Sequence, residues 1–243
     1  HETGALEATG HKILLLDHQD GKLSAESIRT YMEDYLALPN PEHKVEPKLV
    51  YLSQSTELGT LYSKEELKEI HELCQEYGLY LFIDGARLGY ALASEENDLT
   101  LKDLTEFCNA FYIGGTKVGA MMGEAIIITN DLLKPGFRHM IKQNGNLLAK
   151  GRFLGLQFDS LFDENLYLTI SKHAIDCANR IINALRDDGY ELAYPSPTNQ
   201  IFPVLHQKQI DALKDKYIFQ LWEKVDDDRS IIRLCTSWAT KKE

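Results

Sequence analysis

A strand–helix–strand unit in the first half of the chain restricts the fold more than any other feature of the sequence. The run KLVYLS at residues 48–53 is apolar and rich in strand-forming residues, as in a buried strand. Ser63 and Glu66 then have the spacing of a capping box, and the apolar residues that follow recur at helical intervals. The run LYLFI at residues 79–83 is the next strand. Because a helix between two strands usually joins them in parallel, this unit predicts an α/β fold with a parallel sheet.

The same alternation continues after this unit. A helix is expected over residues 101–107 and a strand over residues 110–113. A further strand over residues 124–129 follows too closely for a crossover helix to intervene, so we expect it to be antiparallel. The sheet is therefore predicted to be mostly parallel, with a reversed strand.

The pattern changes in the last third of the chain. A long helical pattern covers residues 167–186, and short strands are expected over residues 199–205 and 231–235. We therefore expect a large domain over residues 1–164, followed by a linking helix and a smaller C-terminal α/β lobe over residues 165–243.

The composition is that of a folded acidic protein. Its 26 Lys+Arg and 37 Asp+Glu residues give a formal net charge of −11, which argues against a nucleic-acid partner. No apolar run approaches the roughly 20 residues that a membrane span needs, and the chain does not open on a basic and then apolar leader. Four cysteines stand far apart in apolar contexts, which favours reduced, buried thiols and a cytoplasmic location. They are Cys74, Cys108, Cys177 and Cys235.

An acidic residue ends the second strand of the unit. In the segment FIDGAR at residues 82–87, Asp84 lies at the carboxyl end of a parallel strand, and open α/β sheets bind ligands at that edge. The alternative role for Asp84 is to cap the next helix.

A lysine surrounded by glycines follows the third strand. The segment GGTKVG at residues 114–119 does not form the phosphate loop of nucleotide hydrolases, because Val118 follows Lys117 where Ser or Thr is required. A lysine and a carboxylate at two strand ends of one sheet instead suit pyridoxal phosphate (PLP). The lysine can bond to the aldehyde, and Asp84 can keep the pyridine nitrogen protonated so that the ring accepts electrons.

The sequence resembles a known family at these positions. FIDGARLGYAL, GGTKVGA and IIRLCTSWAT are similar to segments of the threonine aldolase and β-eliminating lyase family of fold type I PLP enzymes. HETGA at the start and STELGT at residues 55–60 fit the same family. The resemblance implies a mostly parallel sheet of the seven-stranded type. It also implies that part of this sheet, the phosphate-binding loop and a ring-stacking histidine precede this sequence, so we expect the natural chain to be longer.

The resemblance also implies roles for individual residues. Lys117 corresponds to the Schiff-base lysine, and Asp84 to the partner of the pyridinium nitrogen. Arg87 would reach the phenolic oxygen of the cofactor or the substrate, and Arg233 would hold the substrate carboxylate in a two-pronged pair. The alternatives are a surface arginine at a helix start for Arg87 and a salt bridge between the lobes for Arg233.

Glu57 departs from the family pattern. Many threonine aldolases have a histidine at this position, which is thought to handle the hydroxyl proton of the substrate. A carboxylate can act as a base as well where burial raises its pKa, so Glu57 is the candidate catalytic base. The resemblance also makes Lys150 and Arg152 candidates for contact with a phosphate group bound in a neighbouring subunit, and the alternative is a solvated basic turn.

The resemblance implies a PLP-dependent lyase. It would cleave a β-hydroxy-α-amino acid, threonine or allo-threonine, to glycine and an aldehyde by retro-aldol chemistry. The alternatives are PLP-dependent β-elimination or racemisation of an amino acid, and a non-catalytic protein of this fold. The expected partners are a small amino-acid substrate and further copies of the chain, in a homodimer or homotetramer with shared active sites. The histidines show no metal-binding spacing, and no membrane partner is expected.

Overall fold

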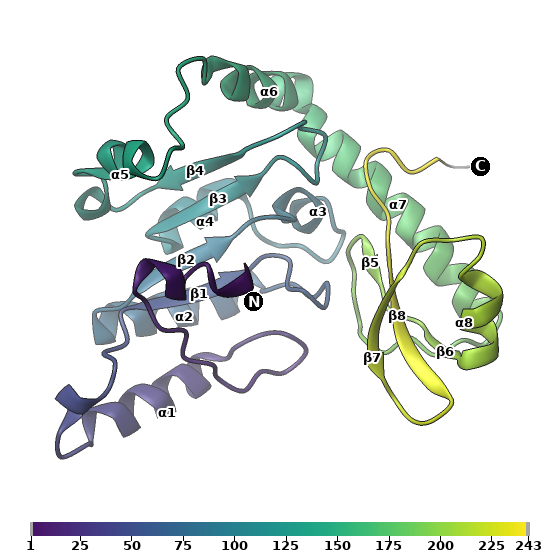
Figure 1. Cartoon of the computed structure of the whole chain (residues 1–243), viewed down its shortest axis with the longest axis horizontal. Helices are drawn as coiled ribbons and strands as arrows, with labels where there is room; N and C mark the ends of the chain where they lie inside the picture. Colours follow the sequence, from purple (N-terminus) through teal and green to yellow (C-terminus); the bar gives the residue numbers. More distant parts are fainter. Residues whose placement is uncertain (1, 242–243) are drawn as a thin grey trace.

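The computed structural model describes residues 2–241, and within them the large domain is built on a four-stranded sheet. The first three strands are parallel, and the fourth is antiparallel to the third, as the sequence predicts. Figure 1 shows this sheet beside the smaller C-terminal lobe. In spatial order the strands are β1 (Leu49–Ser53), β2 (Tyr80–Asp84), β3 (Ala110–Gly114) and β4 (Glu124–Ile128).

Helix α2 (Lys64–Tyr77) is the crossover between β1 and β2. Its N-terminus carries the predicted capping box: the Glu66 backbone N–H donates to Ser63 Oγ (3.2 Å), and the Ser63 N–H donates to Glu66 Oε2 (2.8 Å). The helix ends at Gly78, whose φ of 65° is readily adopted only by glycine. The apolar residues at helical spacing form one face of α2, and this face packs into the core through Leu67, Ile70, Leu73 and Cys74.

The remaining helices of the large domain were predicted only in part. Helix α4 (Leu101–Phe107) has the predicted bounds, but several others have no counterpart among the sequence predictions. The other α-helices are α1 (Ala25–Leu36), α3 (Leu88–Leu92), α5 (Phe137–Gln143) and α6 (Arg152–Phe162). Short 3-10 helices cover Glu2–Gly4, Glu7–Thr9, Pro41–His43, Asp131–Leu133 and Asp163–Asn165.

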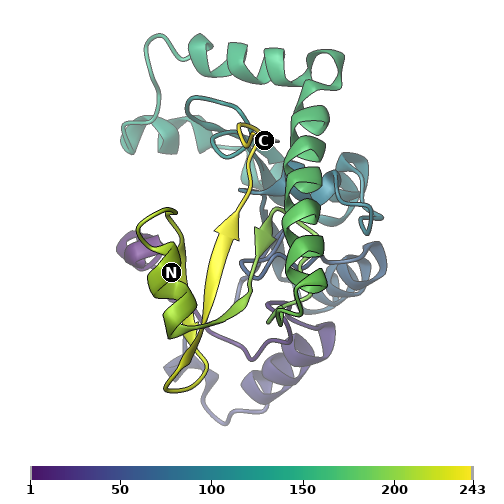
Figure 2. The same cartoon turned by 90° about the vertical axis from the view of Figure 1, so that its right-hand side faces the viewer.

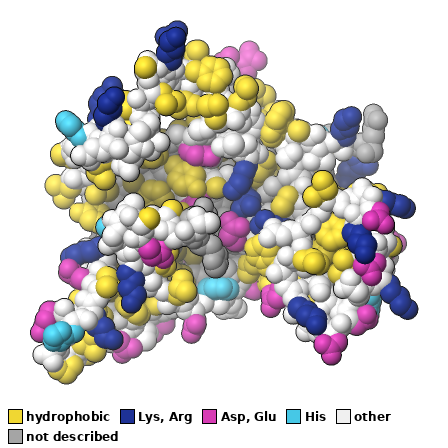
Figure 3. All heavy atoms as spheres, in the orientation of Figure 1, with side chains coloured by type: hydrophobic (Ala, Val, Ile, Leu, Met, Phe, Trp, Pro, Cys, Tyr) yellow, Lys and Arg dark blue, Asp and Glu magenta, His cyan; other side chains and the backbone are white. Residues whose placement is uncertain are grey.

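The two faces of the sheet differ in burial. Leu81 and Ile83 of β2 are fully buried in the core, beneath the helical layer. On the opposite face, Tyr51 of β1 is 40 % exposed and Ile126 of β4 is 52 % exposed. Figure 3 shows hydrophobic side chains in the hollow over this part of the molecule. The alternation of side chains along each strand thus places one set in the core and leaves the other set partly open.

The C-terminal lobe follows the long helix α7 (Leu166–Asp187), which stands in front of the sheet in Figure 2. The strands of this lobe pair only in antiparallel fashion, and β8 pairs with each of the other three. Helix α8 (Gln207–Leu213) packs beside them. The strands are β5 (Gln200–Ile201), β6 (Val204–His206), β7 (Gln220–Lys224) and β8 (Arg229–Cys235).

The single strand predicted over residues 199–205 is wrong in detail. The structure has two short strands, β5 and β6, which pair with opposite ends of β8. They are separated at Phe202 and Pro203. Because Pro203 has no backbone N–H to donate, a continuous ladder cannot run through this point.

The cysteine prediction is correct in three of four positions. All four thiols are free, and Cys74, Cys108 and Cys177 are buried. Cys235, at the end of β8, is exposed. In the described part of the chain, no helix has the length and apolar composition needed to cross a bilayer.

Candidate active site

Asp84 lies at the carboxyl end of β2, where the sequence places it. Its carboxylate accepts hydrogen bonds from Tyr51 Oη (2.6 Å), from Tyr112 Oη and from the backbone N–H of Ala86 (2.9 Å). The N-cap of α3 is Arg87, so Asp84 does not cap that helix. Tyr51 and Tyr112 come from the strands on either side, and sequence reasoning missed both. The only local signal was a tyrosine in each neighbouring strand, on the same face as Asp84.

Two glycines allow the chain segments that carry Asp84 and Lys117 to approach closely. The Gly114 N–H donates to the Gly85 carbonyl oxygen at 2.9 Å. A Cβ atom on Gly85 would lie 1.8 Å from the carbonyl oxygen of Tyr112, and one on Gly114 would lie 2.4 Å from the carbonyl oxygen of Ala86. Only glycine fits at either position without a backbone shift, so the glycines place the ends of β2 and β3 side by side.

The loop that carries Lys117 is held from both sides. Glu124, the first residue of β4, accepts hydrogen bonds from the Gly115 N–H (2.5 Å) and from Thr116 Oγ1 (2.7 Å). The buried Tyr90 donates its hydroxyl hydrogen to the Lys117 carbonyl oxygen. Neither Glu124 nor Tyr90 was identified from the sequence, because their contacts depend on how β4 and α3 dock.

The Lys117 side chain faces a mixed electrostatic environment. Partial desolvation and then the positive charge of Arg87 lower the pKa of its ammonium group, while Glu57, Asp84 and Glu124 act in the opposite direction. The net shift is downward. The amine of Lys117 is therefore neutral at a lower pH than that of an ordinary lysine.

Arg87 is buried, with 8 % of the residue exposed, which contradicts its interpretation as a surface arginine. Its Nη1 donates to Glu57 Oε1 at 2.9 Å. The guanidinium group thus points toward the loop after β1, on the same side as Lys117 and Asp84.

Arg233 projects from β8 of the small lobe toward the same place. Its Nη1 donates to Gln200 Oε1 (3.2 Å) and to Glu57 Oε2 (3.3 Å), and its Nη2 donates to Gln220 Oε1 (2.5 Å). The ring of Trp222 lies 4.7 Å from the guanidinium carbon, in a cation–π contact. The contact with Glu57 is a salt bridge between the lobes, so the alternative interpretation of Arg233 also has structural support. Sequence reasoning missed Gln200 and Trp222.

Glu57 lies between the two arginines and is not buried. Its side chain is 58 % exposed, so the burial on which its prediction as a base depends is absent. The neighbouring loop residues are anchored: the Gln200 amide donates to the Thr56 carbonyl oxygen (3.2 Å), and Thr198 Oγ1 donates to the Gly59 carbonyl oxygen (3.0 Å). Through these hydrogen bonds the loop after β1 holds the small lobe against the large domain.

The structure therefore brings together the five residues selected from the sequence. Figure 3 shows basic and acidic side chains close to one another in the hollow between the sheet and the small lobe. Lys150 and Arg152 are exposed near the start of α6 and have no contact with these residues among the described contacts. The five residues are Glu57, Asp84, Arg87, Lys117 and Arg233.

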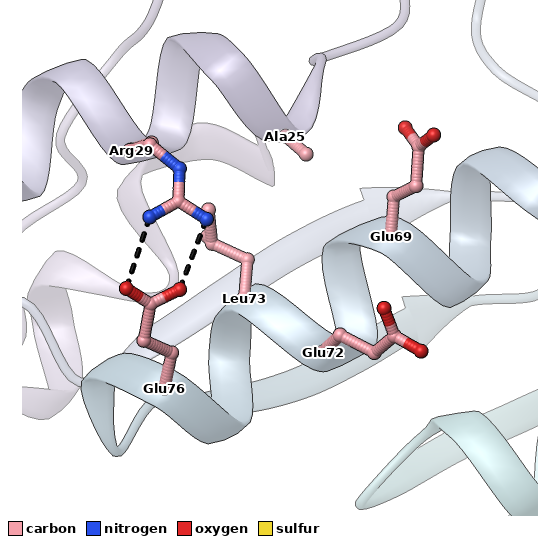
Figure 4. Close-up of a pocket in the computed structure, with 6 residues that line it drawn as sticks. All are labelled: Ala25, Arg29, Glu69, Glu72, Leu73 and Glu76. Carbon is pink, nitrogen blue, oxygen red and sulfur yellow. Dashed lines mark hydrogen bonds and ion pairs between the residues drawn. The ribbon is translucent and has the colours of Figure 1, made fainter.

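A second hollow lies between α1 and α2, away from this site. Figure 4 shows Arg29 paired there with Glu76 through two hydrogen bonds of 2.9 Å, with Glu69 and Glu72 nearby. It contains none of the predicted site residues. Within residues 2–241, no group of three or more His, Cys, Asp or Glu side chains is arranged to hold a metal ion.

Comparisons with known proteins show which family this chain resembles in sequence and in fold. Residues 1–208 match the family model described as "Beta-eliminating lyase". A low specificity L-threonine aldolase from a Pseudomonas strain is 35 % identical over 88 % of this chain, which covers 62 % of that relative. A solved threonine aldolase structure from Leishmania major is 48 % identical, with a TM-score of 0.95, and the match covers 99 % of this chain and 69 % of that one.

More distant solved structures share only the fold. The PLP-bound C–S lyase from Staphylococcus hominis is 15 % identical, with a TM-score of 0.57, over 90 % of this chain and 58 % of that one. The mixed α/β architecture is thus that of fold type I PLP enzymes. The chain belongs to the β-eliminating lyase family, and within that family it is similar to the threonine aldolases.

Proposed function

We propose that this chain is part of a PLP-dependent lyase that cleaves threonine or allo-threonine to glycine and acetaldehyde. The observation that carries the proposal is the placement of Lys117 and Asp84 at adjacent strand ends, with Arg233 of the other lobe facing the same hollow. The similarity to threonine aldolases supports the choice of substrate.

The residues present fit PLP. Asp84 Oδ2 accepts a hydrogen bond from Tyr51 and retains acceptor capacity for a protonated ring nitrogen. Lys117 supplies an amine whose lowered pKa favours the nucleophilic form. Gly85 and Gly114 keep side-chain volume out of the close approach between the strand ends that carry Asp84 and Lys117. When bound, PLP supplies a ring that accepts the electron pair of the bond broken at the substrate Cα.

Each side chain then has a defined task. With PLP bound, Asp84 would hold a proton on the ring nitrogen, Lys117 would attach the cofactor, and Arg87 would donate to the phenolic oxygen of the cofactor or to the substrate. Arg233 binds the substrate carboxylate, in a position fixed by Gln200, Gln220 and Trp222. Glu57, beside both arginines, is the proposed acceptor of the β-hydroxyl proton.

We also propose that the protein is a homodimer or homotetramer with shared active sites, in the cytoplasm. Exposed apolar side chains in the loop between β3 and β4 and on the helices α5 and α6 support an interface between copies. The four free thiols are consistent with a reducing compartment. The exposed apolar residues are Met121, Met122, Met140, Phe153 and Leu156.

The test compares two reactions of the protein that carries this sequence. We expect aldehyde release from threonine and no pyruvate or ammonia from serine. Lys117→Ala should lower kcat/KM for threonine by more than about a thousandfold. Removal of a residue that takes part directly in the reaction removes most of the rate acceleration of an enzyme. Borohydride reduction followed by mass mapping should place the cofactor adduct on Lys117. Pyruvate without aldehyde, or an adduct on another lysine, would contradict the proposal.

A further inference from the structure

One carboxylate in the candidate site contacts both arginines at once. Glu57 Oε1 accepts from Arg87 Nη1 at 2.9 Å, and Glu57 Oε2 accepts from Arg233 Nη1 at 3.3 Å. Arg87 comes from the large domain and Arg233 from the small lobe, with side-chain exposures of 10 % and 17 %. Glu57 therefore neutralises two largely buried guanidinium groups.

A carboxylate ligand of Arg233 would have to use N–H groups that are already engaged. A two-pronged pair needs two parallel N–H donors of the guanidinium group. Arg233 Nη1 donates to Glu57 and Gln200, Nη2 donates to Gln220, and Trp222 covers one face of the group. The hydrogen bond to Glu57 is the longest of the three. Glu57 is also the one negatively charged partner among them, so a ligand carboxylate would compete with it for the positive charge of Arg233.

The backbone of Glu57 is fixed, although its side chain has room to move. Thr56 on one side is buried, and its Oγ1 accepts hydrogen bonds from the N–H groups of Leu58 and Thr60, each at 3.2 Å. The Glu57 side chain is 58 % exposed. Rotation about its side-chain bonds can therefore release Arg233 to a ligand while the loop keeps its other hydrogen bonds to the small lobe, those from Gln200 and Thr198.

We propose that Glu57 is the counter-ion of Arg233 in the resting site and that the carboxylate of the incoming amino acid displaces it. This inference rests on the proposed function, because it takes Arg233 as the site of the ligand carboxylate. Glu57 then weakens the binding of every ligand that uses Arg233, including the product glycine, and so favours product release. This role concerns ligand affinity, whereas a role as base concerns the rate of the cleavage step.

The test measures glycine binding rather than turnover. In the PLP-loaded protein, the change in cofactor absorbance on adding glycine yields its Kd. Glu57→Gln and Glu57→Ala should each lower this Kd by about two- to tenfold, the range expected for a partly exposed ion pair that no longer competes. Ethylamine has a similar amine but no carboxylate, so its Kd should change by less than about twofold.

A matched control removes a charge elsewhere. Glu96→Gln changes an exposed carboxylate outside the arginine pair, and it should leave both Kd values unchanged. An unchanged or higher Kd for glycine in both Glu57 variants, with circular dichroism showing a folded protein, would overturn the inference. Failure of the unmodified protein to bind PLP or glycine would instead contradict the proposed function, so the two failures are distinguishable. A fall in kcat for threonine with no fall in the glycine Kd would assign Glu57 to the cleavage step alone.

Discussion

Lys117 is surrounded by charges of both signs, and their balance decides its protonation. Loss of water contact and the Arg87 guanidinium disfavour the ammonium form, while three carboxylates favour it. The outcome is a lowered pKa, which makes the amine a nucleophile nearer neutral pH. Carboxylates alone would have kept the amine charged, whereas desolvation and Arg87 favour its neutral, nucleophilic form. The mixture suits a residue that must form a covalent bond with a carbonyl group.

The pH dependence of Lys117 acetylation tests this balance. Only the neutral amine reacts, so a lowered pKa means that acetylation rises at lower pH than for an ordinary lysine. Lys214 is the internal control, because its hydrogen bond with Asp211 raises its pKa. In the cofactor-free protein, mass spectrometry of peptides should show the half-maximal rate for Lys117 at a lower pH than for Lys214. Identical pH profiles of acetylation for Lys117 and Lys214 would contradict the lowered pKa of Lys117.

At the scale of elements, the ends of β2 and β3 carry the chemistry because their backbones approach closely. Gly85 and Gly114 make this approach possible, and β4 then returns antiparallel to place Glu124 beside the Lys117 loop. Asp84 and Lys117 are far apart along the chain. They lie close in space because β2 and β3 are adjacent strands, and no local turn joins them.

Substitution of a glycine where the ends of β2 and β3 approach each other should lower the free energy of unfolding far more than substitution of a glycine on a helix surface. Gly85→Ala would place Cβ 1.8 Å from the Tyr112 carbonyl oxygen, so we expect the free energy of unfolding in urea to fall by more than about 3 kcal/mol. Gly155→Ala, in α6, meets no atom within 4 Å and should raise it by about 0.5–1 kcal/mol through helix propensity. Equal effects of the two substitutions would show that the close approach is not a constraint.

At the scale of the whole molecule, the site exists only when the two lobes are docked. The loop after β1 contacts the small lobe through the Thr56 and Gly59 carbonyl oxygens, which accept from Gln200 and Thr198. Ser94 Oγ adds a hydrogen bond to the Pro197 carbonyl oxygen (2.9 Å). These contacts bring Arg233 to residues that precede it by more than a hundred positions.

Gln200 is fully buried and couples this docking to Arg233. Gln200→Leu should raise the Kd of glycine about tenfold, because Arg233 loses a buried partner, and leave the Kd of PLP nearly unchanged. The cofactor absorbance titration measures both. Thr198→Val removes a contact between the lobes without touching Arg233, so its effect on the glycine Kd should be smaller. A larger effect of Thr198→Val would mean that lobe docking, rather than support of Arg233, determines affinity.

Much of the large domain could be predicted because its signals are local. Helical spacing and the Ser63–Glu66 capping box are properties of consecutive residues, and they identify α2 without any tertiary contact. The short gap before residue 124 likewise implies the antiparallel strand β4. The break between β5 and β6 was missed although Pro203 signals it, because the apolar pattern continues through that residue.

The site divides in the same way. Asp84 and Lys117 could be selected from the sequence because each follows a strand, and the motifs around them indicate the family. The sequence by itself thus determined the strand–helix–strand unit, the mostly parallel sheet and the two residues at its strand ends. Only the tertiary structure decided that Glu57 lies between Arg87 and Arg233, and that Tyr51 and Tyr112 hold Asp84. Those contacts depend on strand register and on the docking of the lobes, which are set by packing between segments far apart in the chain.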